Sequence, residues 1–458
     1  MTAGAPVALD ADIRRAYSSD ASGVIMVPDA VARPGTVDEV IELLQRASSE
    51  RTCVTPAAGQ TSTTAASITD RGTLLSLRGL QRVIDIDCAA HTARVEPGVL
   101  VGDLRRACAA EGLLLTPDPT SEEECSVGGA VACNASGARS LRYGATRPYV
   151  RSLRVALASG EVVTLRRPML EKNTVGYALA HDPIDWFVGS EGTLGVILEV
   201  ELSLLPLPES VTGLALAFAD EAGALAFVAA ARDDTTVHPR CLEFFDERAL
   251  AIARSADDDP SWAQGAGALA YVEEVPPAGV EPALDEWLAL AERHGAIVDD
   301  ARVYEGEAAL RDARRIRHAV PAHMNARGDS HRADGGRKVS TDWAVPYRRL
   351  GEALQVARRL ADDAGIEQAV AYGHAGNGHP HQNFIARNAG ELATIEKVVE
   401  ATLREVIAMG GTVAAEHGIG KLKRKWLPLQ MSPLQVRGMQ AIKRELDPQG
   451  ILAPGNVL

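Results

Sequence analysis

Residues 117–144 have the sequence PDPTSEEECSVGGAVACNASGARSLRYG, and residues 188–206 have the sequence VGSEGTLGVILEVELSLLP. The first segment combines adjacent glycines at 128 and 129, an amide at Asn134 and a further glycine at Gly137 with short apolar runs. Glycine is needed where the backbone takes a positive φ or approaches another group closely. Such segments expose backbone N–H and C=O groups, so we expect them to bind a polar ligand. Ordinary turns are the alternative for each segment alone.

Composition indicates a soluble globular protein of two or three domains. The 458-residue chain is 46% hydrophobic and carries a formal charge of −14, from 47 basic and 61 acidic residues. This charge disfavours nucleic acid and anionic membrane surfaces as partners. The N-terminus lacks the apolar segment of a secretory signal, and no apolar run reaches the roughly 18 residues of a membrane helix. We therefore expect a cytoplasmic protein without an integral membrane segment, with peripheral membrane association as an alternative.

The first half of the chain alternates short apolar strands with amphipathic helices. Thr36 to Glu39 has the form of a capping box that opens a helix. The apolar pattern predicts the other elements: strands at 24–28, 53–56 and 195–205, hairpins at 83–99 and 155–164, and a helix at 101–110. Together they predict an α+β domain with two sub-sheets.

The second half begins after a proline-bounded exit at 205–209. Its pattern is that of a ferredoxin-like β-α-β-β-α-β unit, with elements expected at 213–218, 221–231, 240–245, 267–274, 281–294 and 296–304. The arginine-rich passage at 311–343 is expected to be too irregular for a simple helix. Two further helices are expected near the end of the chain, at 391–409 and 433–446.

Histidines gather late in the chain. Of eleven histidines, four fall between residues 374 and 417, in the sequences GHAGNGHPH (373–381) and AEHGIG (415–420). Imidazoles beside a glutamate suggest a divalent metal site or an acid–base centre. A surface loop that carries histidines by chance is the alternative.

These segments together resemble the vanillyl-alcohol-oxidase-type flavoproteins, in the branch of D-lactate, glycolate and D-2-hydroxyglutarate dehydrogenases. That family typically shows PDPGS…GG…N..G….YG, then GSEGTLG, then HxGDGNxH followed by EHGIG. This chain departs from the pattern with Thr120 for a glycine, Ala57 for an arginine, Asn377 for the aspartate and His379 for the asparagine. The C-terminal motif also departs, with Ala453 and Asn456 where the family has asparagine and lysine.

The resemblance implies an α+β fold with a two-subdomain FAD-binding domain in residues 1–207. A ferredoxin-like substrate or cap domain with the metal site would occupy 208–430, and residues 431–458 would return to the FAD domain. FAD is expected to be non-covalent, because neither the 57–67 loop nor the 117–144 segment contains a histidine. The implied cofactor-binding residues are Pro56, Gly59, Gln60, Thr61, Ser62, Pro117, Asp118, Thr120, Ser121, Val127, Gly128, Gly129, Asn134, Gly137, Tyr143, Gly144, Glu191, Gly195, Val196 and Ile197.

The resemblance also implies a metal site and a catalytic set. The metal ligands would be His374, His381 and Glu416, with zinc as the first expectation and Mn²⁺ or Fe²⁺ as alternatives. The catalytic residues would be His417 as base, Arg317 and Lys338 for the substrate anion, and Asn383 for a hydrogen bond to substrate. His379 is expected to support the ligands or to lie on the surface, with an additional ligand role as the less favoured reading.

The expected activity is FAD- and metal-dependent oxidation of a D-2-hydroxy acid to the 2-oxo acid, with hydride transfer to flavin N5. Electrons would pass to an external acceptor such as a quinone, a cytochrome or an electron-transfer flavoprotein. A homodimer is the expected assembly. An oxygen-using oxidase is one alternative. A redox-neutral transferase of the same fold would lack the paired histidine motifs, and a metallohydrolase without flavin would leave residues 117–144 and 188–206 without a purpose.

Overall fold

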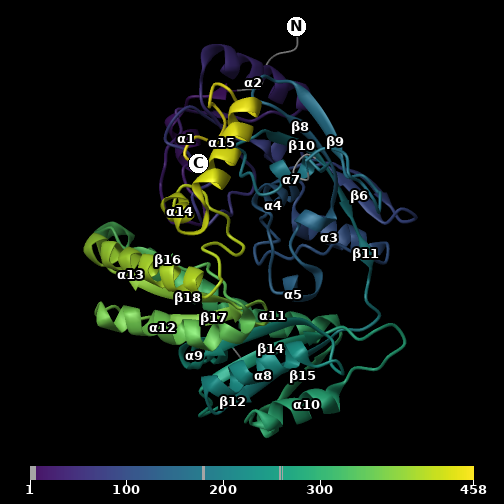
Figure 1. Cartoon of the computed structure of the whole chain (residues 1–458), viewed down its shortest axis with the longest axis vertical. Coiled ribbons are helices and arrows are strands. Elements are labelled where there is room, and N and C mark those ends of the chain that lie inside the picture. The colour runs from purple at the N-terminus through teal and green to yellow at the C-terminus, as the bar shows by residue number, and fades with distance from the viewer. Residues whose placement is uncertain (1–6, 178–180, 257–258, 260) are drawn as a thin grey trace. The chain divides into compact units, whose positions relative to one another are not determined.

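The computed structural model describes residues 7–177, 181–256, 259 and 261–458, and the chain divides into two compact units (Figure 1). The first unit comprises Met1–Gly137, Gly144–Leu207 and Glu416–Leu458, and the second comprises Ala138–Tyr143 and Pro208–Ala415. The last helix, α15 (Pro433–Leu446), therefore belongs to the first unit. Lys443 on α15 fixes it there, because its Nζ donates to the carbonyl oxygens of Thr193 at 2.7 Å and Leu452 at 3.0 Å.

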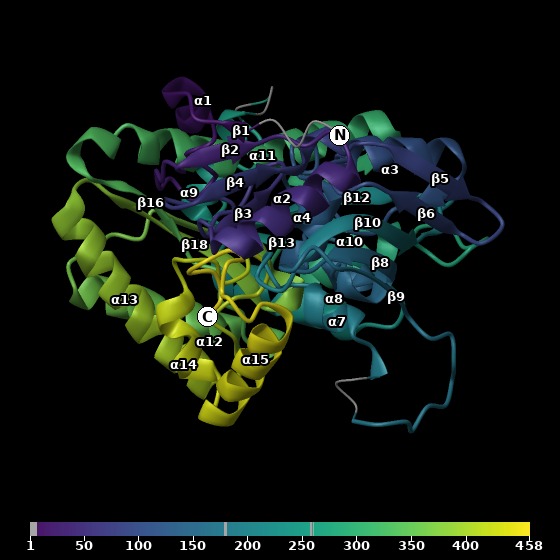
Figure 2. The same cartoon turned by 90° about the horizontal axis from the view of Figure 1, so that it is seen from above.

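The first unit contains two main sheets, as the α+β pattern predicts. The four-stranded sheet has the order β1 (Val7–Ala8), β2 (Ala30–Ala32), β4 (Thr73–Ser76), β3 (Val54–Ala57), and its β2, β4 and β3 run parallel. The five-stranded antiparallel sheet has the order β5 (Val83–Asp87), β6 (Thr92–Val95), β10 (Val196–Ser203), β8 (Val150–Ala156), β9 (Val162–Arg166), and its strands lie side by side in Figure 2. A short pair joins β11 (Leu205–Pro206) to β7 (Leu113–Leu114).

Helix α2 (Val37–Glu50) has the cap and the buried apolar face that its sequence predicts. Thr36 caps it by accepting a hydrogen bond from the N–H of Glu39, and its buried residues contribute to one core with residues of both sheets, which removes their apolar surface from water. Within the described residues of this unit, the other α-helices are α1 (Ala11–Ala16), α3 (Val101–Ala110), α4 (Val127–Cys133), α7 (Ile184–Phe187), α14 (Leu427–Gln430) and α15.

The strand predicted at residues 24–28 is wrong, because the strand lies at β2, two residues later. Ile25 is 58% exposed and Val27 is 36% exposed, so the apolar run does not mark a buried strand. Pro28 has no N–H for a sheet ladder, and its carbonyl instead accepts a hydrogen bond from Nε of Arg14 at 2.6 Å.

The second unit is built on a seven-stranded sheet. Its order is β15 (Arg302–Glu305), β12 (Thr212–Phe218), β14 (Ala268–Glu274), β13 (Pro239–Asp246), β17 (Val370–His374), β18 (His379–Ala386), β16 (Arg337–Ser340), with antiparallel pairing throughout. With α8 (Glu221–Asp233) and α10 (Leu284–Arg293), the first four strands confirm the β-α-β-β-α-β prediction. The other three extend the sheet beyond it.

Helices cover both faces of this sheet. On one face, β12 contributes Ala215 and Ala217 to a core with α9 (Glu247–Ser255) and α11 (Gly306–Asp329). On the other, Phe218 of β12 contacts Phe227 of α8, which in turn contacts Trp287 of α10. In the part of this unit that the structure describes, the remaining α-helices are α5 (Ser140–Tyr143), α12 (Leu350–Asp363) and α13 (Ala389–Ala408).

Helix α11 corrects the expectation of an irregular arginine-rich passage. Its inward face repeats at helical spacing and consists of Leu310, Ala313, Ile316, Val320 and Met324. Arg317 is also buried within this face, and Pro321 lies inside the helix. A charge and a proline on a core-facing helix break the apolar pattern on which sequence reasoning depends.

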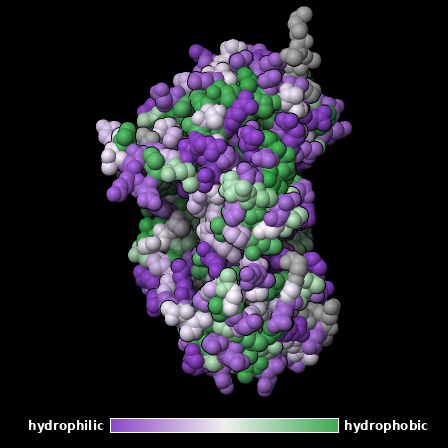
Figure 3. All heavy atoms as spheres, turned by 90° about the vertical axis from the view of Figure 1, so that its right-hand side faces the viewer, coloured by the Kyte–Doolittle hydropathy of each residue, from purple (hydrophilic) through white to green (hydrophobic). Residues whose placement is uncertain are grey.

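Hydrophilic residues cover most of the face shown in Figure 3, with apolar residues in smaller groups between them. None of the helices in the described part of the chain is long and apolar enough to cross a bilayer.

Candidate metal centre and flavin loops

Three histidines share one face of the β17–β18 hairpin. In its register His374 pairs with His379, and Tyr372 pairs with His381. Alternate residues of a strand point to the same side of a sheet, so these four rings face the same way. Between the strands, Gly378 has φ +69° and a Cβ there would lie 2.0 Å from the carbonyl oxygen of Val345, so only glycine fits this turn.

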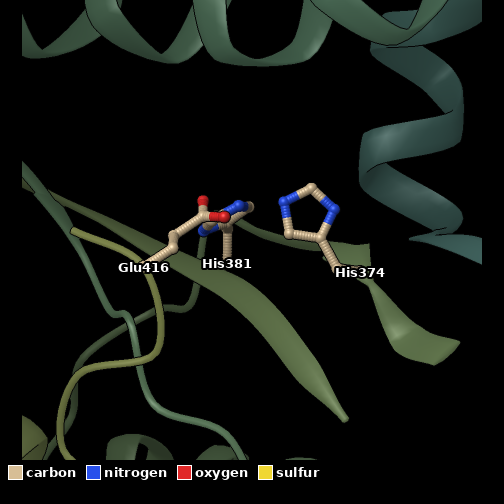
Figure 4. A group of neighbouring side chains, drawn as sticks. All are labelled: His374, His381 and Glu416. Atoms are coloured by element: carbon tan, nitrogen blue, oxygen red, sulfur yellow. The ribbon is translucent and has the colours of Figure 1, made fainter. Parts of the chain in front are cut away.

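The three residues predicted to bind metal lie together in Figure 4. His374, His381 and Glu416 each offer one ligand atom, and these atoms lie within 4.8 Å of one another. The two histidine rings are 5.2 Å apart at their centroids and nearly perpendicular, and both residues are buried. Two imidazole nitrogens and a carboxylate oxygen form the donor set of catalytic divalent-metal sites.

Glu416 reaches this group through a short local pairing. The N–H of Ala415, the last residue of the second unit, donates to the carbonyl oxygen of Asp342 at 2.8 Å, and Ala344 pairs with Thr412. Because Glu416 directly follows Ala415 in the chain, this pairing places Glu416 next to the hairpin that carries the histidines.

Glu243 is a site residue that the sequence analysis missed. It lies on β13 with no exposed surface, its Oε1 is 2.6 Å from Nδ1 of His374, and its Oε2 accepts from Nε of Arg317 at 2.7 Å. Burial alone would raise the pKa of Glu243, but Arg317 and His374 outweigh burial and lower it to about 2. Ionised Glu243 therefore fixes the proton of His374 on Nδ1 and leaves Nε2 as the nitrogen that can bind a cation.

The predicted substrate-binding residues lie on the same face of the sheet. Arg317 of α11 is buried, and although burial opposes its charge, Glu243 raises the pKa of Arg317 above its ordinary value. Lys338 of β16 donates from Nζ to Oδ1 of Asn325 at 2.6 Å, and burial lowers the pKa of Lys338 to about 8. Gly328 lets α11 approach β16, because a Cβ there would lie 2.6 Å from the backbone nitrogen of Lys338.

Asn383 lies on β18, two residues beyond His381. It is fully buried, and its Nδ2 donates to the carbonyl oxygen of His381 at 3.2 Å. Its Oδ1 has no hydrogen-bond partner among the residues that the structure describes. A buried acceptor of this kind suits a bound hydroxyl or water.

His379 is not a surface residue, so that alternative is wrong. It is 4% exposed, and its Nε2 lies 3.2 Å from Oδ1 of Asp342, whose side chain has no exposed surface. The family's aspartate is replaced by Asn377, yet the cluster has two buried carboxylates of its own, Glu243 and Asp342. Both were missed because neither belongs to a motif: Glu243 stands among apolar residues of β13, and Asp342 follows the end of β16.

In the first unit, glycines bring the predicted flavin loops into backbone contact. A Cβ on Gly59 would lie 2.1 Å from the carbonyl oxygen of Glu124, and one on Gly137 would lie 2.1 Å from that of Asp118. A Cβ on Gly128 would lie 2.5 Å from Cβ of Pro97. These glycines therefore allow close packing between loops, and the small and hydroxyl residues of the loops suit a polar cofactor held by backbone groups.

Several predicted cofactor residues have their side chains engaged within the protein. Gln60, at φ +54°, donates to the carbonyl oxygens of Tyr17 and Ser19, each at 3.1 Å. Asn134, at φ +50°, accepts from the N–H of Arg147 at 2.9 Å. These hydrogen bonds fix the conformation of the two loops.

The other implied cofactor residues are spread over loops and strand ends of both units. In the first unit, Pro56 is in β3, and Thr61 and Ser62 follow that strand. Pro117, Thr120 and Ser121 precede α4, and Val127 and Gly129 lie in its first turn. Gly144 is at a unit boundary, Gly195 precedes β10, and Val196 and Ile197 begin that strand. Tyr143 lies in α5, which belongs to the second unit.

Glu191 ties the second flavin segment to the EHGIG loop. Its carboxylate accepts from the N–H groups of Ile419 at 2.6 Å and Gly420 at 2.7 Å. A Cβ on Gly418 would lie 2.6 Å from Oε1 of Glu191, which explains the glycine there. His417 lies in this loop, with its Nε2 3.4 Å from Oε1 of Glu416.

Two family models match the chain, and together they cover most of it. The FAD binding domain matches residues 28–166, and the C-terminal domain of FAD linked oxidases matches residues 207–457. The chain belongs to the family of FAD-linked oxidases. This FAD-linked oxidase is an FAD-dependent oxidoreductase, and the prediction of that family from the sequence is confirmed.

Similar proteins share nearly the whole length of this FAD-linked oxidase. It is 30% identical to a glycolate oxidase subunit of Bacillus subtilis, over 97% of this chain and 92% of the relative. It is 29% identical to a D-lactate dehydrogenase of Anaerostipes hadrus, over 94% and 89%. It is 27% identical to a D-2-hydroxyglutarate dehydrogenase of Stutzerimonas stutzeri, over 98% and 96%.

Among solved structures, an alkyldihydroxyacetonephosphate synthase matches with a TM-score of 0.75, covering 98% of this chain and 82% of that chain. At 19% identity this likeness concerns the fold alone. It confirms the predicted α+β fold of the vanillyl-alcohol-oxidase type.

Proposed function

We propose that this FAD-linked oxidase is a divalent-metal-dependent dehydrogenase that oxidises a D-2-hydroxy acid to the 2-oxo acid. The observation that carries the proposal is the gathering of His374, His381 and Glu416, with ligand atoms within 4.8 Å, in a chain with an FAD-binding domain. The names of relatives at about 30% identity, which concern glycolate, D-lactate and D-2-hydroxyglutarate, support the substrate class.

Each residue of the cluster has a role in this chemistry. When bound, FAD supplies a hydride acceptor for the α-hydrogen, and the cation, with zinc as the first choice, polarises the α-hydroxyl. His417 takes the hydroxyl proton, since an imidazole can act as a base near neutral pH. Arg317 and Lys338 provide fixed positive charge for the substrate carboxylate, and the amide oxygen of Asn383 accepts a hydrogen bond from substrate.

FAD is proposed to be non-covalent, so acid precipitation should release it intact. Electrons are proposed to leave through an external acceptor. In the oxygen-using alternative the reduced flavin would pass its electrons to oxygen. In the redox-neutral alternative the substrate would cause no net reduction of the flavin.

The test is anaerobic mixing of the purified holoenzyme with a panel of D- and L-2-hydroxy acids, followed through the visible absorbance of the flavin. We expect bleaching by one or more D acids, and reoxidation by an electron-accepting dye faster than by oxygen. Faster reoxidation by oxygen would identify an oxidase instead. Absence of bleaching by every acid in the panel would refute the proposed substrate class.

A further inference from the structure

We propose that the histidine hairpin holds a second divalent cation, bound by Asp342, His379 and Glu416. This set offers one ligand atom from each residue, and these atoms lie within 4.8 Å of one another. It shares Glu416 with the set of His374 and His381 and therefore rests on the proposed function of that first site. The centre would then contain two cations bridged by one carboxylate.

The spacing of the two new ligands fits a shared ion. Nε2 of His379 lies 3.2 Å from Oδ1 of Asp342. Two adjacent ligands with bonds of about 2.0–2.2 Å to one cation are separated by about 2.8–3.1 Å in octahedral geometry and by about 3.3–3.6 Å in tetrahedral geometry. The observed 3.2 Å lies between these two ranges. An oxygen-rich set with one imidazole suits Mn²⁺, Fe²⁺ or Zn²⁺.

The rings of the two sets are close enough for paired cations. The centroid of His379 is 4.7 Å from that of His381 and 5.3 Å from that of His374. Cations in two-metal sites lie about 3.5–4 Å apart, with carboxylates and imidazoles from both sides. Neighbouring rings on one face of a hairpin can thus serve two adjacent ions.

The burial of Asp342 and His379 favours the binding of a cation between them. Their side chains are 0% and 5% exposed. Burying an ionised carboxylate costs free energy unless the carboxylate is paired. A divalent ion offsets this cost more fully than one imidazole does. The backbone of Asp342 is fixed as well, because its carbonyl oxygen accepts from Ala415, the residue before Glu416.

The competing explanation is a plain hydrogen bond in which His379 donates to Asp342 and supports a single metal ion. The two explanations differ in metal stoichiometry. Two cations per chain are expected here, and one cation is expected if the pair only supports the first site.

The experiment is a Mn²⁺ titration of the chelator-stripped, FAD-loaded protein, with bound metal measured by mass spectrometry after removal of free ion. We expect two equivalents in the wild type and one in His379→Asn and in Asp342→Asn. His381→Asn should also bind one, at the second site. The matched control His294→Asn changes a histidine at the end of α10, outside the cluster, and should keep two.

Low-temperature electron paramagnetic resonance of the Mn²⁺-loaded wild type gives a readout that needs no variant. We expect the signal of an exchange-coupled pair, replaced by that of isolated Mn²⁺ in His379→Asn. One equivalent with an uncoupled signal, lost in His381→Asn but kept in His379→Asn, would overturn the second site and leave the first. No tightly bound metal in the wild type would overturn both.

Discussion

The carboxylate of Glu243 lies 2.6 Å from Nδ1 of His374, and both side chains are almost completely buried. The second oxygen of the same carboxylate binds Arg317. One glutamate thus orients a predicted metal ligand and forms an ion pair with a predicted substrate-binding cation. It connects two parts of the site that lie 57 residues apart in the chain, since 374 − 317 = 57.

Replacing Glu243 with glutamine should weaken both functions. We expect metal affinity to fall by about 10–100-fold, because the proton of His374 is no longer fixed on Nδ1. The free energy of unfolding should fall by about 3–5 kcal/mol, because Arg317 loses its buried counter-charge. Metal titration and denaturant unfolding measure the two effects. Glu247→Gln, at the exposed start of α9, is the control. Equal metal affinity and stability of the two variants would show that Glu243 has no role in the site.

Chelation should remove catalysis without removing FAD. The proposed metal ligands are two histidines of the second unit with Glu416, whereas the matched FAD-binding domain lies within residues 28–166. We expect chelated protein to keep its flavin absorbance but to lose bleaching by substrate, with recovery on adding metal back. Bleaching at the normal rate in fully stripped protein would show that the metal is not catalytic.

His417→Asn should separate the base from the metal. We expect flavin reduction in a single turnover to slow by about 10²–10⁴-fold, because the proton acceptor is lost. Metal content and FAD content should match the wild type. A variant that reduces its flavin at the wild-type rate would rule out His417 as the base.

Lys338 should make substrate binding depend on pH. Burial lowers its pKa from 10.5 to about 8, so its positive charge disappears as pH rises through about 8. We expect kcat/KM for an anionic substrate to fall above that pH. The sign for stability is opposite: the unfolded chain holds this proton more tightly, so Lys338 makes the folded state more stable as pH rises from about 8 to 10.5.

The matching variant is Lys338→Met, which should lose this pH dependence and lower kcat/KM at neutral pH by the equivalent of about 1.5–3 kcal/mol. Lys397→Met, on an exposed position of α13, serves as its control. An unchanged pH profile in Lys338→Met would assign the ionisation to another group.

Glu191→Gln should loosen the EHGIG loop. The amide has one acceptor oxygen in place of two, so one of the N–H groups of Ile419 and Gly420 loses its partner. We expect a loss of about 1.5–3 kcal/mol in the free energy of unfolding, measured in denaturant. Glu161→Gln, on an exposed turn, should change little. Equal stability of both variants would argue against a structural role for Glu191.

The sequence by itself determined most elements and the family. Helices such as α3 and α15 follow from apolar spacing and caps, which are local properties of the chain. The family follows from glycine and histidine motifs, because only certain residues fit turns such as that at Gly378 or supply imidazole ligands. The set His374, His381 and Glu416 was predicted in the same way, and the structure brings these residues together.

Only the tertiary structure determines which residues lie next to those motifs. Glu243 and Asp342 belong to no motif, and only the pairing of distant strands places them beside the histidines. Arg317 concealed the periodicity of α11, because the helix buries a charge where a core residue is usual. Buried charges of this kind depend on partners far away in the chain, and a local pattern contains no information about those partners.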